Sequence, residues 1–196
     1  MAVADDSAPA EARGVTSLSL FGGIRDRTEH LQRFVQGYAS FAKLPTPRKE
    51  HVEWAPFVEG LALRQRVRLV GTFPSVRGYF DLGQLEQVLI NLIKNATESG
   101  GEQEAVEMEI RTTAGAFSID VRDRGSGMND AVLANAFLPF YSTKRTGTGL
   151  GLAVAREIVD AHGGRLILSN RAGGGLIVTV LLPIGRENDF GTSDEK

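Results

Sequence analysis

The segment TGTGLGLAVAREIVDAHGG, residues 146–164, begins with three alternating glycines and continues directly into a stretch with helical periodicity. A chain places several glycines together where its backbone turns sharply or approaches another group closely. Two familiar phosphate-binding patterns do not fit: Gly147, Gly149 and Gly151 alternate strictly instead of following G-x-G-x-x-G, and the chain has no Gly-Lys pair. What remains is a flexible loop that presents backbone N–H groups at a helix N-terminus, which suits a phosphate chain.

Two more polar patterns accompany the glycines. The segment Leu82–Glu98 has apolar residues at helical spacing, and within it Asn91 and Asn95 are four residues apart, so both amides point to the same side. Asparagine has a low helix propensity, and two on one stripe indicate a polar role. Asp123 lies between the end of a predicted strand and two glycines, where a carboxylate can accept a hydrogen bond from an exocyclic amine.

The hydrophobic pattern alternates between helical and strand periods along the chain. It predicts helices over residues 15–43, 54–63, 82–98, 131–136 and 150–161, and strands over residues 66–73, 76–80, 105–112, 116–122, 165–170 and 176–182. Helices and hairpin strands mixed in this way indicate an α+β fold, a two-layer sandwich with one mixed sheet and helices on one face. We expect residues 1–14 to be flexible, the proline-containing residues 45–53 to be a linker, residues 54–184 to form the domain, and residues 185–196 to be a disordered tail.

The composition narrows the function class. The chain has 196 residues, a net charge of −2 and no cysteine. A protein that binds nucleic acid normally carries a clustered basic excess, and no such excess is present, so we expect no nucleic-acid partner. No apolar run approaches the length of a membrane span, so we expect no membrane contact by this chain and a cytoplasmic location. The absence of cysteine excludes disulfides and thiolate metal sites.

Taken in chain order, the boxes Asn-x-x-x-Asn, Asp-x-Gly-x-Gly, Phe-x-x-Phe and Gly-x-Gly-x-Gly resemble the ATP-binding catalytic domain of sensor histidine kinases. The resemblance covers about Trp54 to Pro183 and includes all four boxes. It implies the Bergerat, or GHKL, ATP-binding fold, with ATP and Mg²⁺ as ligands. The alternating glycines would then be a hinge of the lid that closes over the phosphates.

The resemblance also implies individual roles. Asp123 would bind the adenine amino group, and Asn95 would hold the Mg²⁺ that bridges the phosphates, since an amide oxygen is an acceptable ligand for that ion. Asn91 would lie beside the phosphates, and Lys144 would neutralise phosphate charge. The remaining nucleotide-contacting candidates are Gly125, Gly127, Lys94, Thr143, Gly147, Thr148, Gly149, Leu150 and Gly151, and Phe137 and Phe140 would anchor the lid. One departure is Leu176, at a position where relatives often carry a hydroxyl residue.

Asn91 favours a kinase over an ATPase. ATPases of this fold place a glutamate general base one helical turn before the metal asparagine, and an amide cannot accept a proton usefully at neutral pH. These kinases carry their phospho-acceptor histidine in a His-Glu-x-x-x-Pro-like motif. None of the three histidines lies in such a motif: His30, His51 and His162. We therefore expect transfer of the γ-phosphoryl group to a histidine on a helix absent from this chain. A GHKL ATPase, a serine kinase and a non-catalytic nucleotide-gated interaction module remain alternatives.

The N-terminal part resembles a second element of these kinases. Residues 15–44 look like the second dimerisation helix running into the catalytic domain, in the style of nitrogen-regulation kinases of the NtrB/NtrY type. The resemblance implies a homodimer formed through this helix. It also implies a response-regulator receiver domain as the partner that finally accepts the phosphoryl group on an aspartate.

Overall fold

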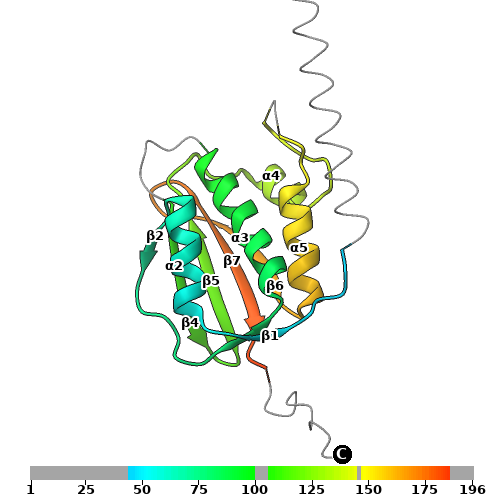
Figure 1. Cartoon of the computed structure of the whole chain (residues 1–196). Coiled ribbons are helices and arrows are strands. Elements are labelled where there is room, and N and C mark those ends of the chain that lie inside the picture. The colour runs from blue at the N-terminus through cyan, green and yellow to red at the C-terminus, as the bar shows by residue number, and fades with distance from the viewer. Residues whose placement is uncertain (1–43, 100–105, 145–146, 186–196) are drawn as a thin grey trace, which may run out of the picture.

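The computed structural model describes residues 44–99, 106–144 and 147–185, and these form a two-layer α+β fold (Figure 1). The strands are β1 (Glu50–Val52), β2 (Arg68–Val70), β3 (Gly78–Phe80), β4 (Glu107–Thr113), β5 (Ala116–Arg122), β6 (Arg165–Asn170) and β7 (Leu176–Pro183). The helices are α2 (Trp54–Gln65), α3 (Leu82–Thr97), α4 (Asp130–Asn135) and α5 (Gly151–Ala161).

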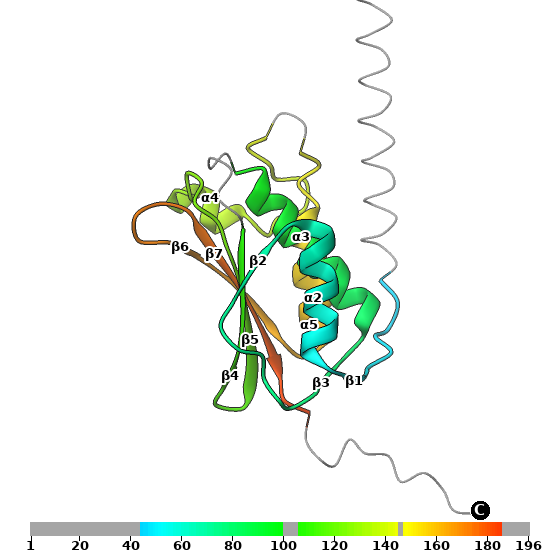
Figure 2. The ribbon, with the colours of Figure 1, turned by 60° about the vertical axis from the view of Figure 1, so that its left-hand side comes forward.

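The larger sheet is mixed, as predicted. Its order is β2-β4-β5-β7-β6, with β2 parallel to β4 and every other neighbouring pair antiparallel. Helices α2, α3 and α5 lie on one face, and no described helix covers the other (Figure 2). The predicted α+β sandwich with helices on one face is therefore confirmed.

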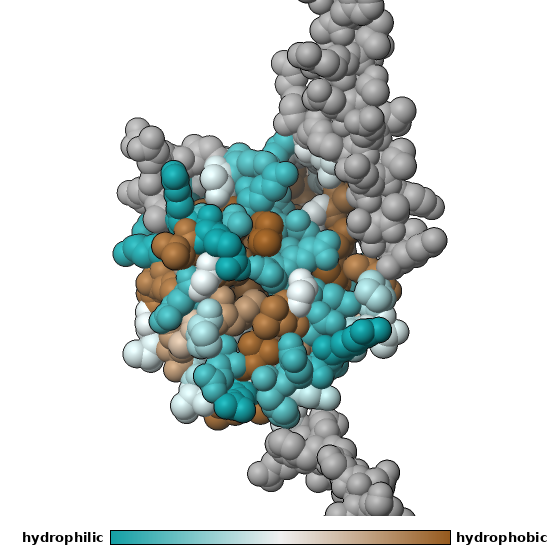
Figure 3. All heavy atoms as spheres, viewed as in Figure 1, coloured by the Kyte–Doolittle hydropathy of each residue, from teal (hydrophilic) through white to brown (hydrophobic). Residues whose placement is uncertain are grey.

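Helix α3 begins and packs as its sequence indicates. The side chain of Asp81 caps the helix by accepting a hydrogen bond from the backbone N–H of Gln84 at 3.0 Å. The apolar stripe faces the sheet and is fully buried: Leu85, Val88, Leu89, Leu92, Ile93 and Ala96. On the outer face that Figure 3 shows, apolar and hydrophilic side chains are interspersed. The core beneath is completed by the rings of Trp54, Phe80 and Phe117.

The segment before α2 differs from the prediction. The sequence predicts no strand within residues 45–53, but β1 pairs antiparallel with β3, which makes a separate two-stranded sheet. A three-residue strand is too short to show periodicity, and this one forms because the backbone of β3 offers it partners. The strand predicted over residues 66–73 is shorter in the structure, because the pairing of β2 with β4 begins at Arg68 and ends at Val70. The predicted helix over residues 15–43 and nearly all of the predicted tail lie outside the described residues.

A buried histidine joins the two central helices at their far ends. His162, at the C-terminal end of α5, is 3% exposed, and its Nε2 accepts the backbone N–H of Asp81 at 3.0 Å. Its Nδ1 lies 2.7 Å from the carbonyl oxygen of Ile158, so Nδ1 carries the proton and donates. His162 is therefore a structural residue at the C-cap of α5. Burial lowers the pKa of His162 from its ordinary value, since the charged form loses water and the neutral form provides the acceptor nitrogen.

We expect the neutral form of His162 to make stability depend on pH. Because its pKa is lower in the folded chain than the unfolded value of about 6.5, the unfolded chain binds more protons below that pH, and stability falls as the solution is acidified. The variant His162→Leu should lose about 1–3 kcal/mol at pH 8, because the Asp81 N–H loses its acceptor. It should also vary less in stability between pH 7 and pH 5, as measured by urea unfolding.

A matched control is Thr113→Ala, which also removes a side-chain hydrogen bond to the backbone but changes no titratable group. This control should keep the wild-type pH dependence. If His162→Leu and the wild-type chain lost the same stability between pH 7 and pH 5, the pH dependence would come from another group.

Candidate functional site

A cavity of about 480 Å³ opens at the end of the molecule where the C-terminal end of α3 meets the N-terminal end of α5. The loop that follows α4 completes its wall. The lining residues are Asn91, Lys94, Asn95, Glu98, Met128, Val132, Ala136, Tyr141, Ser142, Thr143, Lys144, Gly147, Thr148, Gly149, Gly151 and Leu152. The structure thus brings together most of the predicted site residues, and Asp123, Gly125, Gly127 and Leu150 are the predicted ones that do not line the cavity.

The N-terminus of α5 faces this cavity without a side-chain cap. Its N-cap residue, Leu150, makes no capping hydrogen bond, and the first turn carries no acidic residue. Leu150 itself is 3% exposed, so its side chain belongs to the core. The first backbone N–H groups of a helix have no partner within it, and the helix dipole adds partial positive charge there. The arrangement is suited to an anion, and a phosphate group fits it.

The three alternating glycines have different structural reasons. Gly149 adopts φ +66°, and a Cβ there would lie 2.5 Å from the carbonyl carbon of Phe140, so only glycine fits. The backbone N–H of Phe140, itself at φ +67°, donates to the Gly149 carbonyl at 3.0 Å. At Gly147 a Cβ would lie 2.4 Å from the Oγ of Ser142. At Gly151 the nearest atom would be 3.7 Å away, which is ordinary contact, so this glycine leaves the cavity open instead of relieving a clash.

The two asparagines lie where α3 packs against α5. Asn91 donates from Nδ2 to the carbonyl oxygen of Gly151 at 3.4 Å, which ties α3 to the first residue of α5. The amide nitrogen of Asn95 lies 3.7 Å from the position that a Gly151 Cβ would take. Both side chains are half-buried and line the cavity. The same-side placement predicted from their spacing is what the structure shows.

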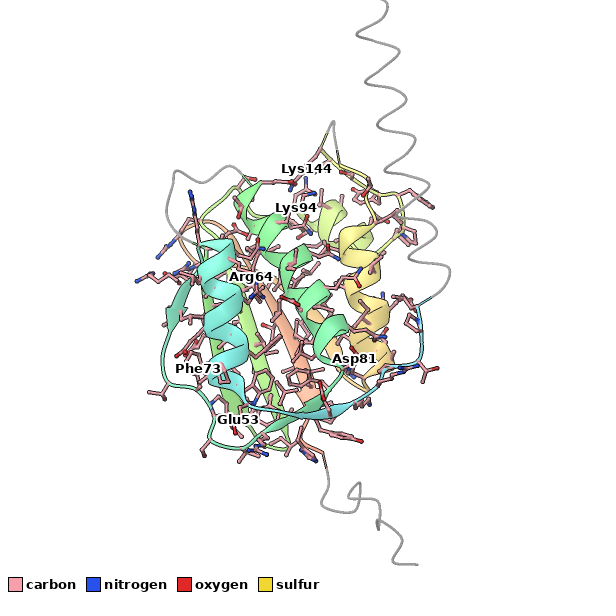
Figure 4. The ribbon with its side chains drawn as sticks, in the orientation of Figure 1. Glu53, Arg64, Phe73, Asp81, Lys94 and Lys144 are labelled. Carbon is pink, nitrogen blue, oxygen red and sulfur yellow. The ribbon has the colours of Figure 1, made fainter. Side chains whose placement is uncertain are left out.

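Two lysines add positive charge at the same end of α3 (Figure 4). The Nζ of Lys144 is 3.0 Å from a carboxylate oxygen of Glu98 and 3.4 Å from the carbonyl oxygen of Asn95. Lys94 reaches the other Glu98 oxygen at 4.0 Å. Cations are stabilised at the C-terminal end of a helix, where the last carbonyl groups lack partners. Lys144 therefore reaches from the loop across the cavity mouth to α3.

Asp123 is a buried carboxylate beside the cavity, 7% exposed. Its Oδ1 accepts the backbone N–H of Gly125 at 2.8 Å and that of Leu176 at 3.2 Å, while its own N–H donates to the Leu176 carbonyl at 3.0 Å. Among the described residues, none donates a hydrogen bond to Oδ2. The carboxylate is thus held in place through Oδ1, while Oδ2 is not engaged by the described residues.

The glycines around Asp123 are required by close backbone approach. A Cβ on Gly125 would lie 2.2 Å from the Oγ of Ser99, two residues after the end of α3. Gly127 adopts φ +68°, in the left-handed region that favours glycine. Met128, which follows, lines the cavity. The segment after β5 therefore leads from the buried carboxylate into the cavity wall.

Sequence reasoning missed three residues of this neighbourhood. The pattern predicts Gly175 only as part of a hairpin turn, but a Cβ there would lie 2.1 Å from the carbonyl oxygen of Asp123. Asn170 binds the backbone of Met128, and Glu98 pairs with Lys144. The run of three glycines is a detectable signal for the first. Asn170 carries no local signal, since its partner is 42 residues away in the sequence. Helical spacing puts Glu98 on the side of Asn91 and Asn95, but its pairing with Lys144 joins residues 46 positions apart.

The departure at Leu176 has a structural explanation. Its side chain is buried at 7% exposure and points into the core, while its backbone N–H and carbonyl both bind Asp123. The backbone of this residue holds the carboxylate whatever the side chain is. A hydroxyl at this position is therefore not needed to orient Asp123.

The donor set fits a divalent ion only together with a ligand. Among the described residues, no group of three or more His, Cys, Asp or Glu side chains could hold a metal. Asn95 offers one amide oxygen at the cavity, and Mg²⁺ usually takes few protein ligands and completes its shell with water and phosphate oxygens. The residues present therefore fit a magnesium ion that arrives with a phosphate chain.

Within residues 44–99, 106–144 and 147–185, no helix has both the length and the apolar character that a membrane span requires. This result concerns the described helices alone.

The sequence is similar to those of known sensor proteins. The chain is 38% identical over 147 residues to the C4-dicarboxylate transport sensor protein DctS of Rhodobacter capsulatus, which covers 73% of this chain and 20% of that protein. It is 29% identical over 162 residues to the putative sensor histidine kinase NtrY-like of Rickettsia bellii, and the match covers 78% of this chain and 27% of that protein. The chain thus spans about a fifth to a quarter of these relatives.

The fold is also that of solved catalytic domains. The nucleotide-free catalytic domain of the histidine kinase ThkA superposes with a TM-score of 0.61 at 24% identity, over 70% of this chain and 96% of that one. The family model of histidine kinase-, DNA gyrase B-, and HSP90-like ATPases matches residues 80–186, which include α3, the cavity loop and α5. The chain belongs to this family of histidine kinase-, DNA gyrase B-, and HSP90-like ATPases, and it is similar to the catalytic region of sensor histidine kinases.

Proposed function

We propose that this chain binds Mg²⁺-ATP in the cavity between α3 and α5 and transfers the γ-phosphoryl group to a histidine on a helix outside the chain. The observation that carries the proposal is the uncapped N-terminus of α5, which faces a cavity that two lysines line. Beside that cavity lies Asp123 with one oxygen left for a donor. A triphosphate and an exocyclic amine are the two ends of ATP, and each has a matching partner.

The proposed roles follow from these positions. The phosphates would lie against the N–H groups at the start of α5, with Lys144 and Lys94 neutralising their charge. Asn95 would contribute its amide oxygen to Mg²⁺, which when bound screens the phosphate charge and orients the transferred group. The adenine amino group would donate to the free oxygen of Asp123. The apolar side chain of Met128 would lie against the base.

A kinase is favoured over an ATPase by the chemistry of the lining. Asn91 occupies the place where a general base would stand, and its amide already donates to the backbone of Gly151. Glu98 is the acidic residue among those that line the cavity, and it is paired with Lys144. At the place of Asn91 a water molecule would therefore find no carboxylate to activate it, and the phosphoryl group is kept for an imidazole nucleophile.

The remaining expectations concern residues and proteins outside the described structure. We propose that residues 15–44 form the second dimerisation helix of a homodimer and that a response-regulator receiver domain finally accepts the phosphoryl group. We place the domain in the cytoplasm, where ATP is available. The nitrogen-regulation subtype stays a proposal, because the chain is more similar to a C4-dicarboxylate sensor than to the NtrY-like protein.

Removal of the Asp123 charge should weaken ATP binding. Calorimetric titration of Mg²⁺-ATP into Asp123→Asn should give an affinity roughly 10- to 150-fold lower than wild type, since a hydrogen bond to a charged group contributes about 1.5–3 kcal/mol. The control Asp160→Asn changes an exposed carboxylate on the last turn of α5 and should bind as wild type does. An unchanged affinity of Asp123→Asn would rule out this carboxylate as the base contact.

The ion pair between Glu98 and Lys144 should compete with nucleotide. Glu98→Gln should bind Mg²⁺-ATP about 1.5- to 5-fold more tightly than wild type, because Lys144 then reaches the phosphates without first breaking an ion pair. The effect is small because both side chains of this pair are partly exposed. Lys144→Ala should bind more weakly. The control Glu86→Gln changes another glutamate of α3, which pairs with Arg64 of α2, and should leave the affinity unchanged. Weaker binding by Glu98→Gln would contradict the competition.

A phosphotransfer assay separates the four candidate functions. The chain should label a separately prepared acceptor helical hairpin from a sensor histidine kinase with γ-labelled ATP, and the product should be labile to acid and stable to base. Asn95→Ala should abolish the label, since the magnesium ligand is lost. Acid-stable label would indicate a serine kinase, release of inorganic phosphate alone an ATPase, and nucleotide binding without either reaction a non-catalytic module.

A further inference from the structure

We infer that Asn170, the last residue of β6, is a positioning residue for base recognition in this cavity. The inference rests on the proposed function. The side-chain amide of Asn170 makes two hydrogen bonds to one residue: Oδ1 accepts the N–H of Met128 at 2.9 Å, and Nδ2 donates to the carbonyl oxygen of Met128 at 2.7 Å. One amide thereby reproduces the paired bonds that two antiparallel strands exchange.

The residue that Asn170 binds is part of the cavity wall. Met128 lines the cavity, and its backbone is held from outside by an amide 42 residues further along the chain. The preceding Gly127 leaves no room for a side chain, since a Cβ there would lie 2.7 Å from the Oδ1 of Asn170 and 3.2 Å from the carbonyl oxygen of Gly175. The segment after β5 is therefore pressed against the turn that joins β6 to β7 (Figure 2).

Both ends of that turn bind the segment after β5. At the far end, the Leu176 N–H donates to the Asp123 carboxylate and the Asp123 N–H donates to the Leu176 carbonyl. Gly175 approaches the Asp123 carbonyl so closely that a Cβ would lie 2.1 Å from it. At the near end, Asn170 binds Met128. The turn thus fixes the carboxylate through one anchor and the cavity wall through the other.

The two anchors have separable consequences. Asp123 keeps its bonds to Gly125 and Leu176 when Asn170 is changed, so the carboxylate stays in place. Met128 loses both bonds of its own anchor, and the wall that faces the base is released. A base held less firmly against the wall no longer keeps its amino group aligned with the carboxylate, and hydrogen bonds weaken steeply with misalignment. Loss of Asn170 should therefore reduce discrimination between bases as well as affinity.

The test compares ATP with ITP, which carries an oxo group in place of the amino group. Calorimetry with both nucleotides and Mg²⁺ should show that the wild-type chain prefers ATP. Asn170→Ala should bind ATP about 3- to 10-fold more weakly and lose most of the ATP-to-ITP preference, in line with two lost hydrogen bonds. Asn170→Asp, which keeps an acceptor for the Met128 N–H but faces its carbonyl with a carboxylate, should behave in the same way.

A matched control lies at the opposite end of β5. Thr113 also bonds from its side chain to the backbone across a turn, at 3.0 Å to the Ala116 carbonyl. Thr113→Ala should leave both the affinity for ATP and the ATP-to-ITP ratio as in wild type. A merely structural role of Asn170 would lower the melting temperature and weaken both nucleotides equally, without a change in the ratio.

The outcomes distinguish this inference from the proposed function. A wild-type chain that prefers ATP, together with a folded Asn170→Ala of unchanged ratio, would overturn the role of Asn170 and leave the proposed function standing. A folded wild-type chain that binds no ATP would overturn both. If Asn170→Ala does not fold, Asn170→Ser is judged by the same ratio, since its shorter side chain cannot make both bonds to Met128.

Discussion

Helices α3 and α5 pack antiparallel, and the cavity at one end of this helix pair depends on that packing. The packing places the C-terminal end of one helix beside the N-terminal end of the other, so carbonyl groups of the last turn of α3 and N–H groups of the first turn of α5 lie at one cavity. The first attract cations and the second attract an anion. At the far ends of the same helices, His162 binds Asp81 and sets how far the two helices slide along each other.

The asparagines show how packing and chemistry share residues. Asn91 ties α3 to Gly151, the first residue of α5, and it faces the same cavity into which a ligand would come. An amide can do both because it donates to a carbonyl with one end and offers an oxygen with the other. A carboxylate in this place could not donate to Gly151, so an amide at position 91 suits the contact between the two helices.

The base side of the site is built from backbone contacts. Asp123 is held by N–H groups of Gly125 and Leu176, and the surrounding glycines allow main chains to approach at distances that a side chain would prevent. Such contacts do not depend on the identity of most neighbouring side chains. For this reason the leucine side chain at position 176 does not disturb the carboxylate.

Much of this architecture follows from the amino-acid sequence alone. Long amphipathic segments such as α3 and α5 have a periodicity that directs one face of each helix onto the sheet, and the four-residue spacing of Asn91 and Asn95 puts both amides on the same side of α3. Short or non-local features depend on the tertiary structure. Strand β1 exists because β3 pairs with it, and the contacts of Glu98 and Asn170 join residues more than 40 positions apart. Periodicity reports only how a segment meets the core, whereas these contacts depend on which distant segments the finished fold brings together.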